Sequence, residues 1–136
     1  MRLTIVARGR IGQSPEADLV DRYRARVRDL SVVEIGELAP WPRFAGGRTV
    51  VLDETGADLP SPALAERLRQ WQDGGAREVR FLIGAADGHD AATRAAADLL
   101  LGFGRATWPH MLVRAMLAEQ IYRATTIMAG HPYHRT

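Results

Sequence analysis

Apolar residues along the chain alternate between short continuous runs and longer stretches with helical spacing. A short apolar run bounded by turn residues is typical of a buried strand. Five segments predict strands, at residues 3–7, 31–35, 49–53, 79–84 and 103–107. The intervening segments and the last one predict helices, at residues 14–30, 61–73, 89–100 and 109–129.

Two of these helices begin with the same signal. Ser14 and Ser61 each precede a proline, which puts serine at the N-cap and proline at the first helical position. The pair Gly74-Gly75 ends the second helix. Residues 36–47, in contrast, hold two prolines and two adjacent glycines and predict a loop.

Strands that alternate with helices indicate an α/β fold, with a mainly parallel sheet between layers of helices. A length of 136 residues fits a single domain over residues 1–136, and the sequence has no internal repeat or linker.

Composition narrows the class of protein. Hydrophobic residues make up 46% and charged residues 25%, as in an ordinary globular protein. No apolar run approaches the ~20 residues that span a bilayer, and polar residues follow Met1 too soon for a signal peptide. The chain has no cysteine, which excludes disulfides, thiol nucleophiles and thiolate metal sites. We therefore expect a cytoplasmic protein that does not contact a membrane.

Charge adds little by itself, because the formal net charge is only +2. All 18 basic residues are arginine, and residues 1–48 carry nine of them against six acidic residues. Any attraction to RNA should therefore be strongest in the first third of the chain. Arg22, Arg24, Arg26 and Arg28 lie in the first helix. Helical geometry splits them into two rows, which are either solvated flanks of the apolar stripe or, for one row, an RNA-facing edge.

The predicted strand ends are the candidate ligand site. In an open parallel sheet, ligands bind beyond the carboxyl ends of the strands. Three such ends contain glycines, at residues 52–56, 84–88 and 102–108. Glycine lets the backbone approach a flat ligand closely, although ordinary turns would use it too. Neither a P-loop nor a G-x-G-x-x-G fingerprint is present, so the pattern favours a nucleoside-like ligand over a polyphosphate.

The last helix and the tail carry two further signals. Apolar residues cover more than half of the helix circumference, so the helix is either deeply buried or shared with another subunit. The tail, His131-Pro132-Tyr133-His134-Arg135, combines residue types that stack on bases and pair with phosphates. The four histidines form no i,i+4 pair with a carboxylate nearby, so we expect no metal site. No G-x-S-x-G elbow is present either.

With these residues in place, the chain resembles the SPOUT methyltransferases that modify pseudouridine at N3 in large-subunit ribosomal RNA (the RlmH family). The resemblance is densest in Trp108-Pro109-His110-Met111-Leu112-Val113-Arg114 and in the tail. It continues through residues 118–124, extends to Val51-Leu52-Asp53 and Leu82-Ile83-Gly84, and covers most of the chain from Arg48 onward. Two features depart from the family. The loop after the fourth strand reads Gly84-Ala85-Ala86-Asp87-Gly88 where the family has Gly-Gly-Pro-Glu-Gly, and residues 36–47 form a loop where the family has a helix.

The resemblance implies a SPOUT-type parallel-sheet sandwich with a C-terminal trefoil knot, a homodimer, and S-adenosylmethionine held in the knot. It implies cofactor contacts at Leu52, Gly84, Phe103, Gly104, Arg105, Ala106, Thr107 and Trp108. The last helix would then be core and dimer interface, and the tail would close over the cofactor of the partner subunit.

Methyl transfer to pseudouridine N3 requires an in-line arrangement and loss of the N3 proton. As candidate catalytic residues we take Arg135, which would hold the imidate or a phosphate, and His110 or His134, which would accept the proton. Alternatively, His110 only orients the start of the last helix. Tyr133, His134, Arg135 and Arg114 are the candidate substrate contacts, and Arg114 and Glu119 alternatively form a structural ion pair.

The expected partner is ribosomal RNA, on the assembled ribosome. Two other functions stay open. One is a SPOUT methyltransferase that acts on tRNA. The other is a non-catalytic RNA- or ribosome-binding module, which the altered loop Ala85-Ala86-Asp87 would favour.

Overall fold

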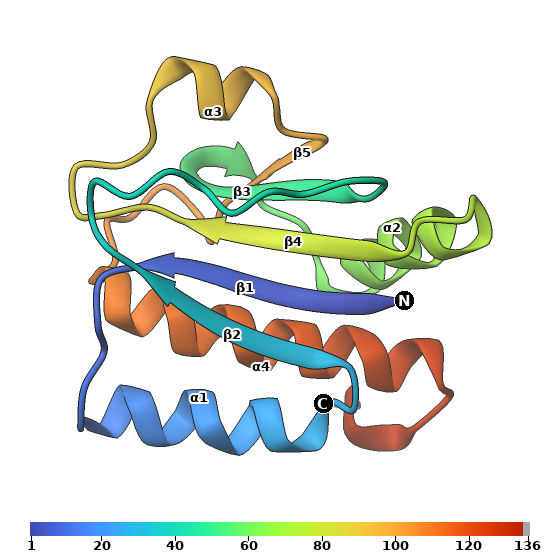
Figure 1. Cartoon of the computed structure of the whole chain (residues 1–136). Helices are drawn as coiled ribbons and strands as arrows, with labels where there is room; N and C mark the ends of the chain where they lie inside the picture. Colours follow the sequence, from blue (N-terminus) through green and yellow to red (C-terminus); the bar gives the residue numbers. More distant parts are fainter. Residues whose placement is uncertain (135–136) are drawn as a thin grey trace.

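The computed structural model describes residues 1–134. Within them the elements are β1 (Arg2–Arg8), α1 (Pro15–Arg26), β2 (Leu30–Ile35), β3 (Arg48–Ala57), α2 (Ser61–Asp73), β4 (Glu78–Ile83), α3 (Ala91–Ala95), β5 (Leu99–Leu101), α4 (His110–Met128) and a final 3-10 turn, η1 (Pro132–His134). The five strands form one sheet in the order β2-β1-β4-β3-β5, and all four pairings are parallel (Figure 1). The predicted α/β architecture with a parallel sheet is confirmed.

One face of the sheet carries the main hydrophobic core. Alternate strand residues such as Ile5, Val50 and Phe81 are fully buried there against α2 and α4. The three helices α1, α2 and α4 lie together, because α1 and α2 both pack against α4. In Figure 1, α1 and α4 run below the sheet. Because successive side chains of a strand point to opposite faces of the sheet, every second strand residue points into this core.

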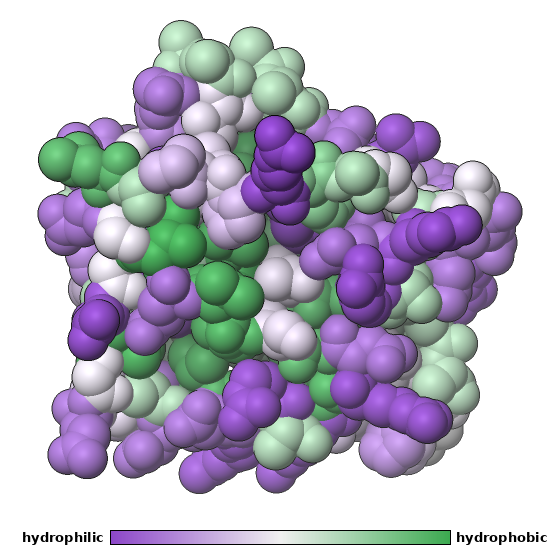
Figure 2. Space-filling view, in the orientation of Figure 1, coloured by the Kyte–Doolittle hydropathy of each residue, from purple (hydrophilic) through white to green (hydrophobic). Residues whose placement is uncertain are grey.

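The opposite face has a smaller core. Val6, Val51 and Leu82 are buried there, with Trp41 and Leu100 packed against them. The cover comes from Trp41, within residues 36–47, which contain no helix, and from Ala97, which follows α3. The loop prediction for residues 36–47 is therefore confirmed. The cover is incomplete at the edge strand β2, where Val33 is 39% exposed, and Figure 2 shows an apolar area in this region bordered by hydrophilic side chains.

The side chain of Arg8 holds the loop of residues 36–47, the segment in which the resembled family has a helix. Arg8 Nη1 donates to the carbonyl oxygens of Gly36, Glu37 and Ala39 at 3.2, 3.1 and 2.7 Å. Its guanidinium also lies 4.0 Å from the ring centroid of Trp41. A loop with few internal hydrogen bonds is thereby tied to β1 at the edge of the sheet where the parallel strands end.

The starts of the first two helices differ from each other. Ser14 caps α1 as predicted, because its hydroxyl accepts the N–H of Ala17 at 3.1 Å. The cap prediction for Ser61 is wrong. Pro60 occupies the N-cap of α2, and Ser61, the first helical residue, donates its hydroxyl to Oε1 of Gln120 on α4 at 2.7 Å. The first helix also ends earlier than predicted, at Arg26, because the chain must turn to begin β2 at Leu30.

The predictions for residues 89–107 are wrong in two respects. The helix covers only Ala91–Ala95, and the fifth strand is Leu99–Leu101 rather than residues 103–107. Pairing with β3 overrides the helix propensity of the alanine-rich run. Asp98 N donates to the carbonyl of Thr49 at 2.9 Å, and Thr49 N donates to Oδ2 of Asp98 at 2.8 Å. A fully buried parallel strand reads as a continuous apolar run, and here that run is the three leucines.

The last helix agrees with its prediction, with Pro109 at the N-cap and Met128 as the last helical residue. Leu117, Ala118, Ile121 and Ala124 are fully buried within the chain. Intrachain burial therefore accounts for much of the apolar arc. No helix formed by residues 1–134 is long and apolar enough to cross a membrane.

Candidate functional site

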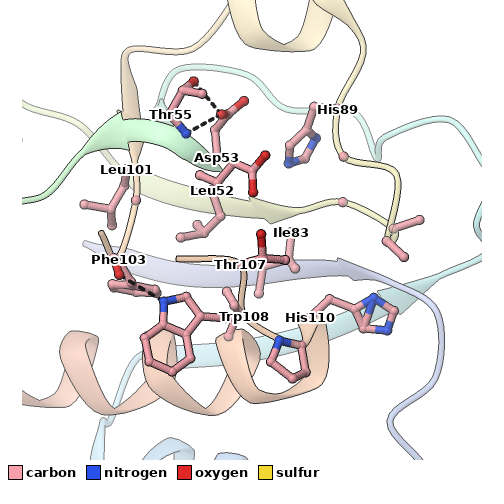
Figure 3. Close-up of a pocket in the computed structure, with 18 of the residues that line it drawn as sticks. Leu52, Asp53, Thr55, Ile83, His89, Leu101, Phe103, Thr107, Trp108 and His110 are labelled. Atoms are coloured by element: carbon pink, nitrogen blue, oxygen red, sulfur yellow. Dashed lines mark hydrogen bonds between the residues drawn. The ribbon is translucent and has the colours of Figure 1, made fainter. Parts of the chain in front are cut away.

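A cavity of about 850 Å³ lies beyond the carboxyl ends of β3, β4 and β5 (Figure 3). Three segments form most of its lining: residues 52–55, residues 83–89 and residues 101–111, interrupted at position 105. Arg94 and Val113 complete the lining. The three segments are the strand ends that the sequence singled out. Because the strands are parallel and adjacent in the sheet, their ends meet at one edge.

The first wall forms where β3 departs from regular pairing. Leu52 pairs with Leu101, and so does Ala57, so residues 53–56 bulge out of the ladder. Gly56 is needed for this path, because a Cβ there would lie 2.7 Å from the backbone of Leu101. Gly102 is equally confined, since its Cβ would meet the carbonyl oxygen of Asp53 at 2.7 Å. The two glycines let β5 and its exit pass tightly against the end of β3.

An ionised carboxylate stands on the bulge. Asp53 Oδ1 accepts the N–H and the hydroxyl of Thr55 at 2.8 and 2.7 Å, and its Oδ2 lies 2.7 Å from Nε of Arg94. Burial alone would raise the pKa of Asp53, but the bonds from Thr55 and the charge of Arg94 outweigh it and lower the pKa. Asp53 therefore faces the cavity as an acceptor that is already oriented.

The second wall is the loop after β4. Gly84-Ala85-Ala86-Asp87-Gly88 closes as a turn, in which Gly88 N donates to the carbonyl of Ala85 at 2.9 Å. Gly88 has φ +84°, a conformation that favours glycine. A Cβ on Gly84 would lie 3.2 Å from Cε1 of His89, so the imidazole sits directly over this glycine. This backbone bond closes the loop although alanines occupy positions 85 and 86.

The third wall is the segment between β5 and α4. Trp108 Nε1 donates to the carbonyl oxygen of Phe103 at 3.0 Å, which closes residues 103–108 into a loop. Gly104 within it has φ +88°. Figure 3 shows Asp53 and His89 toward one side of the cavity and Thr107 and Trp108 toward the other.

The structure brings together most of the residues predicted to contact a cofactor. The ones that line the cavity are Leu52, Gly84, Phe103, Gly104, Ala106, Thr107 and Trp108. Arg105 belongs to the same loop, but it is exposed and does not line the cavity. The structure shows that the seven lining residues lie around one cavity, but that they contact a cofactor stays a prediction.

The candidate catalytic residues lie at two different places. His110 begins α4 and lines the cavity. His134 lies in η1, beyond the other end of α4, where its Nδ1 is 2.9 Å from the carbonyl oxygen of His131. A helix of 19 residues spans roughly 28 Å, so His110 and His134 of one chain are far apart. Arg135 lies outside the described residues.

Tyr133, in η1, packs against the side of α4. Its ring centroid lies 4.4 Å from that of Tyr122, and its hydroxyl donates to Oε1 of Glu119 at 3.3 Å. The guanidinium of Arg123 lies 4.9 Å from the ring and also pairs with Glu119 at 2.6 Å. Burial, followed by the neighbouring Tyr23 and Glu119, raises the pKa of Tyr133 to about 12. Its phenol is therefore neutral at ordinary pH.

Arg114 forms a buried ion pair, but its partner is Glu34 and not the predicted Glu119, which pairs with Arg123, while a contact of Arg114 with substrate stays a prediction. Its side chain is 1% exposed, and it forms an ion pair with Glu34 at the end of β2. Its Nη2 also donates to the carbonyl oxygens of Arg8 and Gly9 at 3.4 and 3.3 Å. These contacts join the N-terminal part of α4 to the ends of β1 and β2.

The arginines of the first helix region are all exposed, as both of their interpretations require. Arg26 differs from the others, because its guanidinium lies 5.8 Å from the ring of Tyr23 and 5.6 Å from that of Tyr122. Among residues 1–134, no group of three or more histidine and acidic side chains could hold a metal ion.

Sequence reasoning missed two polar side chains of the cavity, His89 and Arg94. Both fall in the segment that was assigned to one long helix, where a histidine and an arginine look like ordinary surface residues. A signal was nonetheless present in Asp90, which caps α3 by accepting the N–H of Thr93 at 2.8 Å and so separates His89 from the helix.

Several known proteins are similar in sequence to almost the whole of this chain. A model of the family described as "Predicted SPOUT methyltransferase" matches residues 42–134. The chain is 61% identical to a protein of Rhizorhabdus wittichii and 58% identical to one of Novosphingobium aromaticivorans, and each alignment covers 99% of both chains. It is 44% identical to a protein of Nitrobacter winogradskyi, again over 99% of both chains. All three relatives are named "Ribosomal RNA large subunit methyltransferase H".

Proposed function

Because the chain belongs to the SPOUT methyltransferase family, we propose that it transfers a methyl group from S-adenosylmethionine to N3 of a pseudouridine in large-subunit ribosomal RNA. The proposed substrate is the assembled ribosome, which also implies a cytoplasmic location. We take residues 1–136 as one domain. The single observation that carries the proposal is the cavity where three glycine-containing strand ends meet.

The lining of the cavity fits a nucleoside sulfonium. Apolar residues such as Leu52, Ile83 and Leu101 surround backbone groups that the glycines leave accessible. Asp53 adds an oriented carboxylate, which suits hydroxyl groups or a cation. Among the described residues, the lining also contains no cluster of cations of the kind that a polyphosphate would need, since Arg94 is already paired with Asp53. When bound, S-adenosylmethionine supplies an electrophilic methyl group and a leaving thioether.

The chain itself must position the acceptor and remove a proton. In the transfer, a bond forms between N3 and the methyl carbon, the carbon–sulfur bond breaks, and the N3 proton passes to a base. His110 lines the cavity and is our candidate for that base, with His134 of a second subunit as the alternative. Arg135 would hold the imidate oxygen or a phosphate, a role that rests on the resemblance of the tail.

A homodimer and a trefoil knot belong to the same proposal. Residues 131–134 lie beyond the end of α4 that is opposite to the cavity, so a tail that acts in a cavity would come from a second chain (Figure 1). Leu112 and Met116 on α4 are only partly buried within one chain and are available for an interface. The tight passage of β5 against Gly56 is the kind of contact that a threaded C-terminal segment would make.

Calorimetry with S-adenosylmethionine tests the cofactor. We expect binding in the micromolar range or tighter, with Gly84→Val strongly weakened because a side chain there would collide with His89. A matched control is Gly36→Val, at a glycine outside the lining whose φ is not positive and whose added Cβ would meet only Cβ of Ala39, at 3.8 Å. If the wild type does not bind, the protein is neither a ribosomal RNA methyltransferase nor a tRNA methyltransferase. A non-catalytic RNA- or ribosome-binding module would then be the remaining function.

Transfer of labelled methyl groups tests the reaction. Assembled ribosomes, free large subunits and tRNA are incubated with the protein and labelled S-adenosylmethionine. We expect label in ribosomal RNA of assembled ribosomes and a large loss of rate in Arg135→Ala. Label in tRNA alone would replace the proposed substrate, and a full rate in Arg135→Ala would remove the role of the tail.

A further inference from the structure

His89 is a cavity residue to which the proposed reaction gives no role. Its Nε2 atom is buried, yet among residues 1–134 it has no hydrogen-bond partner. The carbonyl groups of Leu52 and Leu82 are near the ring but do not form a hydrogen bond with Nε2. A buried nitrogen without a partner costs free energy, which a ligand atom that bonds to it recovers.

The position of the ring is fixed from two sides. Its Cε1 lies over Gly84, at 3.2 Å from the place of a Cβ on that glycine. From outside the cavity, the ring of Trp41 packs against it at 5.8 Å between centroids. Trp41 is fixed in turn, because its Nε1 donates to the hydroxyl of Thr93 at 3.3 Å and Arg8 stacks on it at 4.0 Å. These contacts leave the imidazole few possible orientations, and a residue that contacts a ligand has to be restricted in this way.

The charge state of His89 suits a neutral contact. Burial disfavours the imidazolium and lowers the pKa of His89, and the positive Arg8 acts in the same direction. Asp53 opposes this shift, but its carboxylate is already paired with Arg94. At neutral pH the imidazole is therefore uncharged and can donate through one nitrogen and accept through the other.

From this geometry we propose that His89 contacts the nucleoside of the methyl donor and that Trp41 is the positioning residue that holds it there. The inference rests on the proposed function, because it assigns a residue to the same cavity. The nucleoside is the part indicated, since His89 lies beside Leu52 and Gly84, where backbone groups and Asp53 offer bonds to a base or a ribose. His110, the candidate base that must lie near the reacting methyl group, belongs to the other wall (Figure 3).

Calorimetry with two ligands tests the contact. S-adenosylmethionine and S-adenosylhomocysteine share the nucleoside but differ in the sulfonium charge. Loss of one neutral hydrogen bond in His89→Leu should weaken both by a similar factor, roughly three- to tenfold. His89→Gln, whose amide can donate and accept, should recover part of the affinity. Circular dichroism and urea midpoints establish that both variants are folded.

Three outcomes overturn the inference. If folded His89→Leu binds both ligands with unchanged affinity, His89 does not contact the ligand, and the proposed function is unaffected. If only the binding of S-adenosylmethionine is weakened, His89 contacts the sulfonium, and the assignment to the nucleoside is refuted. Failure of the wild type to bind either ligand refutes the proposed function and the inference together.

A double-mutant cycle tests the role of Trp41. Trp41→Leu should weaken both ligands in the wild-type background but change little in His89→Leu, because its effect passes through the imidazole. Equal effects in both backgrounds would contradict the positioning role. Trp71→Leu is the matched control, since Trp71 packs against the main core and lies 5.7 Å from Arg67, outside the cavity. It should lower stability and leave the affinity unchanged.

Discussion

Removing Glu34 should destabilise the protein more than removing Arg114, its partner. Arg114 is 1% exposed and Glu34 is 35% exposed, so the two charges differ in their access to water. Glu34→Ala leaves a buried guanidinium with two carbonyl contacts of 3.4 and 3.3 Å. Arg114→Met instead leaves a carboxylate that water reaches and that still accepts the N–H of Ile11 at 2.8 Å.

The magnitude follows from these two environments. Breaking a fully buried pair costs about 3–5 kcal/mol, because one charge stays uncompensated. The partial exposure of Glu34 lets water approach the guanidinium, which reduces the expected cost of Glu34→Ala to about 2 kcal/mol. Methionine fills much of the arginine volume with no charge, so Arg114→Met should cost about 1 kcal/mol or less.

Urea unfolding followed by circular dichroism measures both values. All variants are compared at one chain concentration, because subunit association would add to stability. The double variant should resemble Arg114→Met, since no guanidinium is left to be uncompensated. A cost for Arg114→Met equal to or above that of Glu34→Ala would refute the reasoning.

The same pair predicts a pH dependence. Burial alone would raise the pKa of Glu34, but the bonds from Ile11 and Arg114 outweigh it, and the pKa falls below the usual 4.5. The stabilisation is therefore complete above pH 4.5 and is lost as the pH falls through the lowered value. In Arg114→Met this acid-dependent loss should shrink.

Three further predictions concern the cavity and the tail. Gly102→Ala should lower the free energy of unfolding by about 1–3 kcal/mol, because its Cβ would press on the carbonyl of Asp53, and a wild-type urea midpoint would contradict the close approach. The lowered pKa of His89 means that the unfolded chain takes up a proton first as the pH falls below 6.5, so stability should decline there and decline less in His89→Gln. Tyr133→Phe should cost about 0.5–1 kcal/mol through the lost bond to Glu119, and an ultraviolet titration should lose a phenol that ionises at about 12.

The elements that sequence patterns predicted well are those whose local signals agree with their packing. The first four strands are apolar runs bounded by turns, and all four formed, although β3 continues to Ala57 instead of ending at Asp53. The cap at Ser14 and the long apolar helix after Pro109 formed as well. In each case propensity, capping and burial favour the same structure, so no tertiary contact has to override a local one.

The errors fall where pairing decides the structure. Residues 96–101 carry alanine and leucine, which favour a helix, yet the backbone of Asp98 pairs with Thr49 and draws the leucines into the sheet. A distant contact also decides the role of Ser61. A serine before a proline resembles an N-cap, but the hydroxyl of Ser61 donates to Gln120, which is far away in the sequence. Neither partner is near in sequence, so local patterns could not reveal these contacts.

The site was partly predictable for a physical reason. Glycines after parallel strands mark the edge where ligands bind, and the three segments marked in this way do line one cavity. His89 and Arg94 escaped notice because their place in the cavity depends on the short α3 and on the loop that carries Trp41. Their contribution becomes visible only when that loop is seen to pack on the sheet.

The most direct test of the account is the identity of the methylated nucleoside. Ribosomes that lack the modification are incubated with the protein and S-adenosylmethionine, and their large-subunit RNA is digested and analysed by mass spectrometry. The account predicts a single new product, pseudouridine methylated at N3, which is absent when Gly84→Val replaces the wild type. Methylation of a different nucleoside, or no new product despite cofactor binding, would contradict it.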